Sequence, residues 1–171
     1  MPAPRIRRAG LTLIELALVL SLTGALLAAF LPTFFRHLST SKVAEAVEQL
    51  DQLHRHAASY YASHRACLPD SAGPYPAAPS ADPVEVDFAQ DEHGIATWQA
   101  LARGPATLRF GYQVEVIEPG CRQRAVGPAL YLRAFGDLDG DGVTSMFERA
   151  SRVERGALVP QGPLRTVNRV E

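Results

Sequence analysis

The sequence predicts an α+β protein in which a long N-terminal helix, with a membrane half and an amphipathic half, packs on a small antiparallel β-sheet. Three observations predict this fold class. An apolar run extends from Leu11 to Leu31, apolar residues then recur every three or four positions to about His64, and alternating apolar and polar residues follow later in the chain. These periods are those of helices and strands. The length of 171 residues leaves room for one domain beyond the apolar run.

The apolar run is long enough to cross a membrane, because about 20 helical residues at roughly 1.5 Å each span a ~30 Å hydrocarbon core. It contains one carboxylate, Glu15. An unpaired carboxylate in a bilayer costs about 2.5 to 3.5 kcal/mol, so we expect Glu15 to have a functional partner. The basic residues Arg5, Arg7 and Arg8 precede the run, which predicts that this end stays in the cytoplasm and the rest lies outside.

Three interpretations of this N-terminus compete. A secretory signal peptide would have an apolar core of about 7 to 15 residues, which is shorter than this run and would not explain its glutamate. A plain signal anchor leaves Glu15 without a reason. Cleavage after Gly10 would instead give Leu11 a free α-amine one helical turn from Glu15. In a packed assembly that amine could pair with the carboxylate of a neighbouring copy.

The junction between the basic leader and the apolar run has the sequence AGLTLIEL over residues 9–16. It resembles the type III signal peptide of type IV pilins and pseudopilins, which a prepilin peptidase cleaves after the glycine and N-methylates on the new first residue. The resemblance implies cleavage between Gly10 and Leu11, N-methylation of Leu11, and an assembly role for Glu15. It also places Gly24 and Pro32 at the helix-softening glycine and proline of the family. One departure is Leu11, where the family usually has Phe.

The resemblance also implies a domain organisation and a function. Residues 1–10 are expected to be a leader peptide, residues 11–64 the N-terminal helix with 11–31 in the membrane, and residues 65–171 a globular pilin head. The expected function is a non-enzymatic structural subunit of a type IV pilus or pilus-like filament. Alternatives are a minor or tip pilin acting as a calcium-dependent adhesin or binding module, and a type II secretion pseudopilin.

Partners and location follow from the same resemblance. We expect identical or related pilin subunits, the prepilin peptidase, inner-membrane assembly machinery, and membrane lipid before assembly. The chain would lie in the inner membrane with its head outside the cytoplasm, and then in a cell-surface or periplasmic filament. Without the three leader arginines the chain has 14 basic and 18 acidic residues, so no broad nucleic-acid-binding surface is indicated.

Beyond Pro32 the apolar positions predict an amphipathic helix, with charged residues between them. These positions are Val43, Ala46, Val47, Leu50, Leu53, Ala57, Tyr60 and Tyr61. His54 and His56 lie two residues apart, so they are expected on nearly opposite sides of this helix and cannot bind one metal ion together.

The rest of the chain predicts strands and loops. Residues 67–83 are rich in Pro, Ala, Ser and Gly, which predicts an extended surface loop. Alternation predicts one long strand over 107–117, and residues 97–102 around Trp98 predict a helical turn. Further strands are expected in the following ranges: 84–88, 129–135, 143–149 and 163–170.

Cys67 and Cys121 both follow the apolar run and therefore belong to the part expected outside the cytoplasm, where disulfides persist. A single bridge between them is expected, and it would contribute about 4 kcal/mol by restricting the unfolded chain. Two unpaired buried thiols are the alternative.

An acidic loop predicts a calcium site. Residues 137–148 match the spacing D-x-D-x-D-G-x5-E, in which alternate carboxylates converge on one hard cation. The expected flanks are strands, so we expect an EF-like loop rather than a full EF-hand. A plain Asp/Gly hairpin turn is the alternative. The ligands expected for Ca²⁺ are Asp137, Asp139, Asp141, the carbonyl of Val143, and Glu148.

Overall fold

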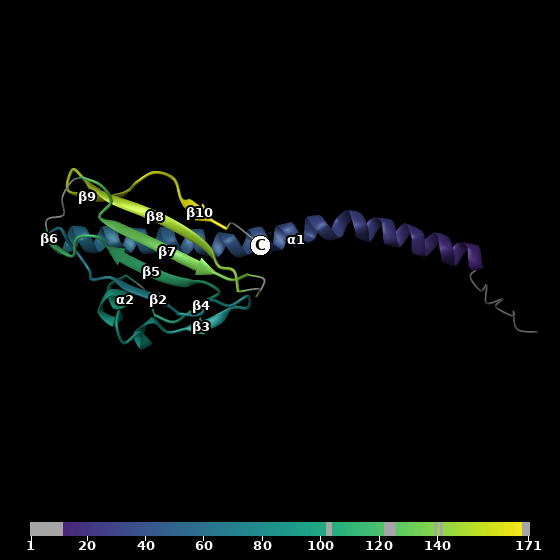
Figure 1. Cartoon of the computed structure of the whole chain (residues 1–171), viewed down its shortest axis with the longest axis horizontal. Coiled ribbons are helices and arrows are strands. Elements are labelled where there is room, and N and C mark those ends of the chain that lie inside the picture. Colours follow the sequence, from purple (N-terminus) through teal and green to yellow (C-terminus); the bar gives the residue numbers. More distant parts are fainter. Residues whose placement is uncertain (1–11, 102–103, 122–125, 139, 141, 169–171) are drawn as a thin grey trace, which may run out of the picture. The chain divides into compact units, whose positions relative to one another are not determined.

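The computed structural model describes residues 12–101, 104–121, 126–138, 140 and 142–168 (Figure 1). The chain is an α+β protein with an N-terminal apolar helix and an antiparallel sheet. It divides into two compact units, Met1–Leu38 and Ser39–Glu171.

Helix α1 (Leu13–Ser63) contributes to both units, and its bounds agree with the predicted helix of residues 11–64. In the first unit, Leu13–Leu31 is long and apolar enough to cross a membrane, and none of it is buried within the protein. The helix continues through Gly24 and Pro32.

In the second unit, α1 places one apolar face in the core. The predicted spacing is confirmed, because these residues are buried: Val43, Ala46, Leu50, Leu53, Ala57 and Tyr61. Val47 and Tyr60 are partly buried against the same core. A buried Leu or Tyr side chain stabilises the folded state by about 2 kcal/mol, so this face holds α1 on the sheet.

The main sheet has six antiparallel strands in the order β10-β8-β7-β5-β2, with β9 also paired to β8. The strands are β2 (Ala72–Tyr75), β5 (Gly111–Val116), β7 (Leu130–Gly136), β8 (Ser145–Glu154), β9 (Ala157–Pro160) and β10 (Arg165–Val167).

One face of this sheet packs on α1. Val114, Leu132 and Arg149 are in register on adjacent strands, and Arg149 forms an ion pair with Asp51 of α1. Since successive side chains alternate between faces, Arg133 and its neighbours in register lie on the opposite face.

Smaller elements complete the second unit. Strand β1 (Cys67–Leu68) pairs with β6 (Gly120–Cys121), and β3 (Val84–Val86) pairs with β4 (Ala106–Leu108). A 3₁₀ turn, η1 (Phe88–Gln90), and helix α2 (Ile95–Leu101) lie between β3 and β4 in the chain. Trp98 of α2 is fully buried, and its Nε1 donates to Asp91. The strands and the helical turn predicted at 84–88, 97–102, 129–135, 143–149 and 163–170 are confirmed with shifted ends.

The prediction of one strand over residues 107–117 is wrong. The chain bends at Arg109 and Phe110, so β4 joins β3 while β5 joins the main sheet. Glu45 of α1 explains the break: its carboxylate accepts hydrogen bonds from the backbone N–H of Arg109 at 2.8 Å and from its guanidinium at 3.0 Å. The backbone N–H of Arg109, which could have paired with a neighbouring strand, donates to Glu45 of α1 instead.

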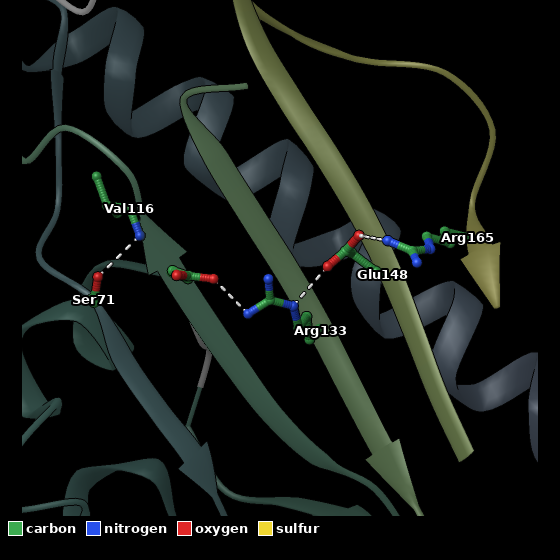
Figure 2. A network of polar contacts seen from close by, with 6 residues as sticks. Ser71, Val116, Arg133, Glu148 and Arg165 are labelled. Atoms are coloured by element: carbon green, nitrogen blue, oxygen red, sulfur yellow. Dashed lines mark hydrogen bonds and ion pairs between the residues drawn. The ribbon is translucent and has the colours of Figure 1, made fainter. Parts of the chain in front are cut away.

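The predicted surface loop of residues 67–83 is also wrong in part, because it contains β1 and the edge strand β2. Leu68 and Ala72 are buried. Pro74 has no N–H to donate and is tolerated because β2 has a neighbour on one side only. Next to this strand, the Ser71 hydroxyl accepts a 2.9 Å hydrogen bond from the N–H of Val116 (Figure 2).

Candidate functional site

The start of α1 is capped by three reciprocal hydrogen bonds between Thr12 and Glu15. Glu15 N–H donates to Thr12 Oγ1 at 3.3 Å, while Glu15 Oε2 accepts from Thr12 N at 2.8 Å and from Thr12 Oγ1 at 2.9 Å. This is a capping box, which satisfies backbone donors that the first helical turn leaves unpaired. Sequence reasoning missed this role of Glu15, although the T-x-x-E pattern of residues 12–15 carries the signal.

The capping box does not neutralise Glu15. Both Thr12 donors are uncharged, so they orient the carboxylate and leave its charge in place. Gly10 and Leu11, the predicted cleavage and methylation site, lie outside the described residues.

Polar side chains further along the apolar part of α1 are satisfied within the helix. Ser21 Oγ donates to the Leu18 carbonyl at 3.0 Å, and Thr23 Oγ1 donates to the Val19 carbonyl at 2.7 Å. A hydroxyl bonded in this way can lie in an apolar environment without a further partner. At Gly24, an added Cβ would have no atom within 4 Å. The predicted softening of the helix at Gly24 and Pro32 stays a prediction.

Cys67 and Cys121 form a disulfide, as expected. The bridge joins β1, which directly follows α1, to β6. It closes a chain segment with a sequence separation of 54 residues. The pairing thus connects the end of α1 to the chain that follows β5.

The predicted calcium loop is described at Asp137 and only in part beyond it. The Asp137 carboxylate accepts hydrogen bonds from Gly140 N at 2.8 Å and from Gly142 N at 3.1 Å. Both glycines have positive φ, which a tight turn at these positions requires. Lys42 of α1 donates to the Leu138 carbonyl at 3.0 Å. Asp139 and Asp141 lie outside the described residues.

The structure does not bring Glu148 together with Asp137. Glu148 is buried on β8, and its carboxylate accepts from Arg133 Nε of β7 at 2.7 Å (Figure 2). Arg165 lies 3.8 Å away on the other side, and Arg133 also pairs with Glu115. Among the described residues, no group of three or more His, Cys, Asp or Glu side chains is placed to hold a metal ion. Val143 is exposed, and calcium binding by the five predicted ligands stays a prediction from the sequence.

A polar cluster between α1 and β8 was not expected from the sequence. His54 Nδ1 lies 3.0 Å from Ser151 Oγ, and Arg149 pairs with Asp51 at 2.5 Å. Burial and the positive charge of Arg149 lower the pKa of His54 from its ordinary value. Ser151 is fully buried and His54 is half-buried, so their contact lies between α1 and β8 in the interior of the second unit. His56 instead contacts the Leu101 carbonyl, which confirms that the two histidines lie on different sides of α1.

Comparison of the chain with protein-family models, curated proteins and solved structures finds no match. The fold and the N-terminus define its class: an α+β protein with one N-terminal apolar helix, a capped helix start that contains a carboxylate, and a disulfide-bonded second unit.

Proposed function

We propose that this chain is a structural subunit of a type IV pilus or pilus-like filament. A prepilin peptidase would cleave after Gly10 and methylate Leu11, and the subunits would then polymerise through the apolar part of α1. The observation that carries the proposal is the AGLTLIEL junction at residues 9–16, which leads into an apolar helix with Glu15 in its first turn. Its proposed role is structural rather than enzymatic.

The apolar helix supports this proposal physically. Leucine and phenylalanine side chains between Leu13 and Phe34 are exposed by 42% or more. Such a surface needs lipid around it or the apolar helices of other copies. When one surface contacts a different surface of the next copy, the copies close into a ring only if the rotation between them allows it. Otherwise they extend as a helical filament.

The proposed route has two locations. The subunit would wait in the inner membrane with the second unit outside the cytoplasm, and would then enter a cell-surface or periplasmic filament through inner-membrane assembly machinery. The Cys67–Cys121 disulfide supports an oxidising location for the second unit.

The mature N-terminus tests the proposal. We expect mass spectrometry of surface filaments to show a chain that begins at N-methylated Leu11. Gly10→Val should block cleavage and leave the chain in the membrane fraction. Pro4→Ala, in the leader and away from the junction, is the control and should be processed normally. A mature chain that retains Met1, or that begins within Ala25–Ala29 as after signal peptidase, would refute the proposal.

The acidic loop motivates a second candidate function, a minor or tip pilin that acts as a calcium-dependent adhesin. Subunit abundance separates the two, because a major subunit dominates purified filaments and a tip protein is scarce. Calcium dependence has its own measurement, a rise in melting temperature at millimolar Ca²⁺ that Asp139→Ala removes. A type II secretion pseudopilin would show the same processing in a periplasmic filament.

A further inference from the structure

A groove of about 440 Å³ lies between the last turns of α1 and helix α2. We call it the α1–α2 groove. The described residues that line it are His56, Ser59, Tyr60, Ser63 and His64 of α1 with Gln99 and Ala100 of α2. Figure 1 shows α2 next to β2, at the edge of the main sheet. The volume falls in the range of about 300 to 1,000 Å³ that is usual for small-molecule sites.

The lining is polar and holds no carboxylate, ammonium or guanidinium group among the described residues. Of the described lining residues, all but Ala100 carry a hydroxyl, an amide or an imidazole, and none is an Asp, Glu, Lys or Arg. The charged residues on this part of α1, such as Asp51 and Arg55, do not line the groove. A ligand that fits this lining is neutral and makes many hydrogen bonds, because a charged ligand would lose its hydration without gaining an opposite charge.

The two histidines each present a hydrogen-bond acceptor. His56 Nδ1 lies 2.6 Å from the Leu101 carbonyl, and His64 Nδ1 lies 3.0 Å from the Tyr60 carbonyl. A carbonyl only accepts, so Nδ1 carries the proton in both rings, and Nε2 is the acceptor of each neutral imidazole. Gln99 and Ser59 can both donate and accept. The groove therefore combines donors and acceptors over a short distance.

An aromatic surface completes the lining. The rings of Tyr60 and His64 stack with their centroids 3.9 Å apart and an angle of 11° between their planes. Stacking restrains both side chains at the end of α1 and covers one face of each ring. Tyr60 is partly buried and His64 is exposed, so the ring face left for a ligand is the outer face of His64. Flat aromatic faces suit ligands that have one apolar C–H face and polar edges.

We propose that the α1–α2 groove binds a neutral saccharide. A sugar ring combines these properties: hydroxyls that each donate and accept, no charge, and a C–H face that can lie on an aromatic ring. An extended peptide is a different class of ligand. It fits less well because its backbone hydrogen-bonding groups lie in a row, whereas the polar side chains of the groove come from two helices.

The test uses the full chain in phospholipid nanodiscs, since detergents with sugar headgroups would compete. The probes are an array of immobilised neutral and acidic oligosaccharides, followed by calorimetric titration of the best neutral ligand. Ser59→Trp fills the groove from an exposed position of α1. Ala62→Trp, about one turn on, is also at an exposed position and is not among the described lining residues, so it is the matched control.

We expect retention of at least one neutral oligosaccharide, at least a tenfold loss of affinity in Ser59→Trp, and less than a twofold change in Ala62→Trp. Gln99→Ala, which changes an exposed side chain of α2, should also weaken binding. Far-UV circular dichroism would verify that each variant stays folded, because two of the variants carry a second tryptophan beside Trp98. The proposal is overturned if the array retains no neutral sugar, if it retains only acidic sugars, or if Ser59→Trp binds as tightly as the natural chain. Binding of extended peptides in place of sugars would assign the groove to the other class. Because filament assembly is not measured, the result is independent of the proposed function.

Discussion

The imidazole of His54 lies between α1 and β8, with Ser151, Arg149, Asp51 and Arg55 as its polar surroundings. Burial contributes most to the lowered pKa, followed by the charge of Arg149, while Asp51 acts in the opposite direction. The folded state therefore binds a proton at His54 less readily than the unfolded chain, whose histidine pKa is about 6.5. This contribution to stability is fully present above pH 6.5 and is lost as the pH falls from 6.5 toward the lower folded pKa.

We expect the melting temperature of the second unit to fall between about pH 7.5 and 5.5, and His54→Gln to reduce that fall, because glutamine does not titrate. Trp98 is the single tryptophan and is buried in this unit, so its fluorescence reports the unfolding. His56→Gln is the control on the other side of α1 and should keep the pH dependence of the natural chain. If His54→Gln retained the full pH dependence, the lowered pKa of His54 would not be its cause.

At the scale of the elements, the ion pairs of β5, β7, β8 and β10 cross the sheet face opposite α1 (Figure 2). Glu148→Gln removes the negative charge of a side chain that is 9% exposed, and it leaves Glu115 as the charged partner of Arg133. We expect a loss of about 2 kcal/mol, less than the about 3 to 5 kcal/mol for a fully buried pair, because Arg133 is partly exposed. Denaturant unfolding, monitored by Trp98 fluorescence, measures this loss in the free energy of unfolding.

Glu154→Gln is the matched control, since it removes a glutamate from an exposed pair with Arg152 and should cost less than about 0.5 kcal/mol. The same measurement with a calcium chelator separates two roles of Glu148. An ion-pair role predicts an equal loss with and without calcium, whereas a loss that appears only with calcium would support the predicted ligand role instead.

Sequence patterns predicted elements whose cause is local. The spacing from Val43 to Tyr61 identified the buried face of α1, and alternation identified β7. The break between β4 and β5 was not predictable in this way, because Glu45 is 64 residues from Arg109 in the sequence. The motif at residues 137–148 gives spacing only, whereas the pairing of β7 with β8 decides that Glu148 meets Arg133.

At the scale of the whole molecule, the two units have different tasks in the proposed filament. The second unit has its own core, disulfide and ion pairs, so its stability does not require assembly. The apolar part of α1, Leu13–Leu31, is not buried against any other part of the described chain. Assembly should therefore depend on α1 and on the charge at its start, and little on changes inside the second unit.

Glu15 can now be tested for two separate roles. Its carboxylate accepts hydrogen bonds from Thr12 in the capping box, and in the proposed filament it also pairs with the methylated amine of Leu11 in a neighbouring copy. Glu15→Gln keeps an acceptor for the capping box and removes the charge, because glutamine also serves at this position. Glu15→Val removes both. If charge pairing drives assembly, both variants should be cleaved and membrane-bound but reduced at least tenfold in sheared filaments.

Thr23→Val is the control within the same apolar stretch, because the Thr23 hydroxyl bonds only to its own helix at Val19 among the described contacts. It should assemble as the natural chain does. Quantitative immunoblots of sheared filaments and membranes measure both fractions. Normal incorporation of Glu15→Gln together with loss of Glu15→Val would assign Glu15 to the capping box alone, since the uncharged side chain would then be sufficient. Loss of both variants, with Thr23→Val unaffected, is the result expected from a carboxylate that pairs with a neighbour's amine.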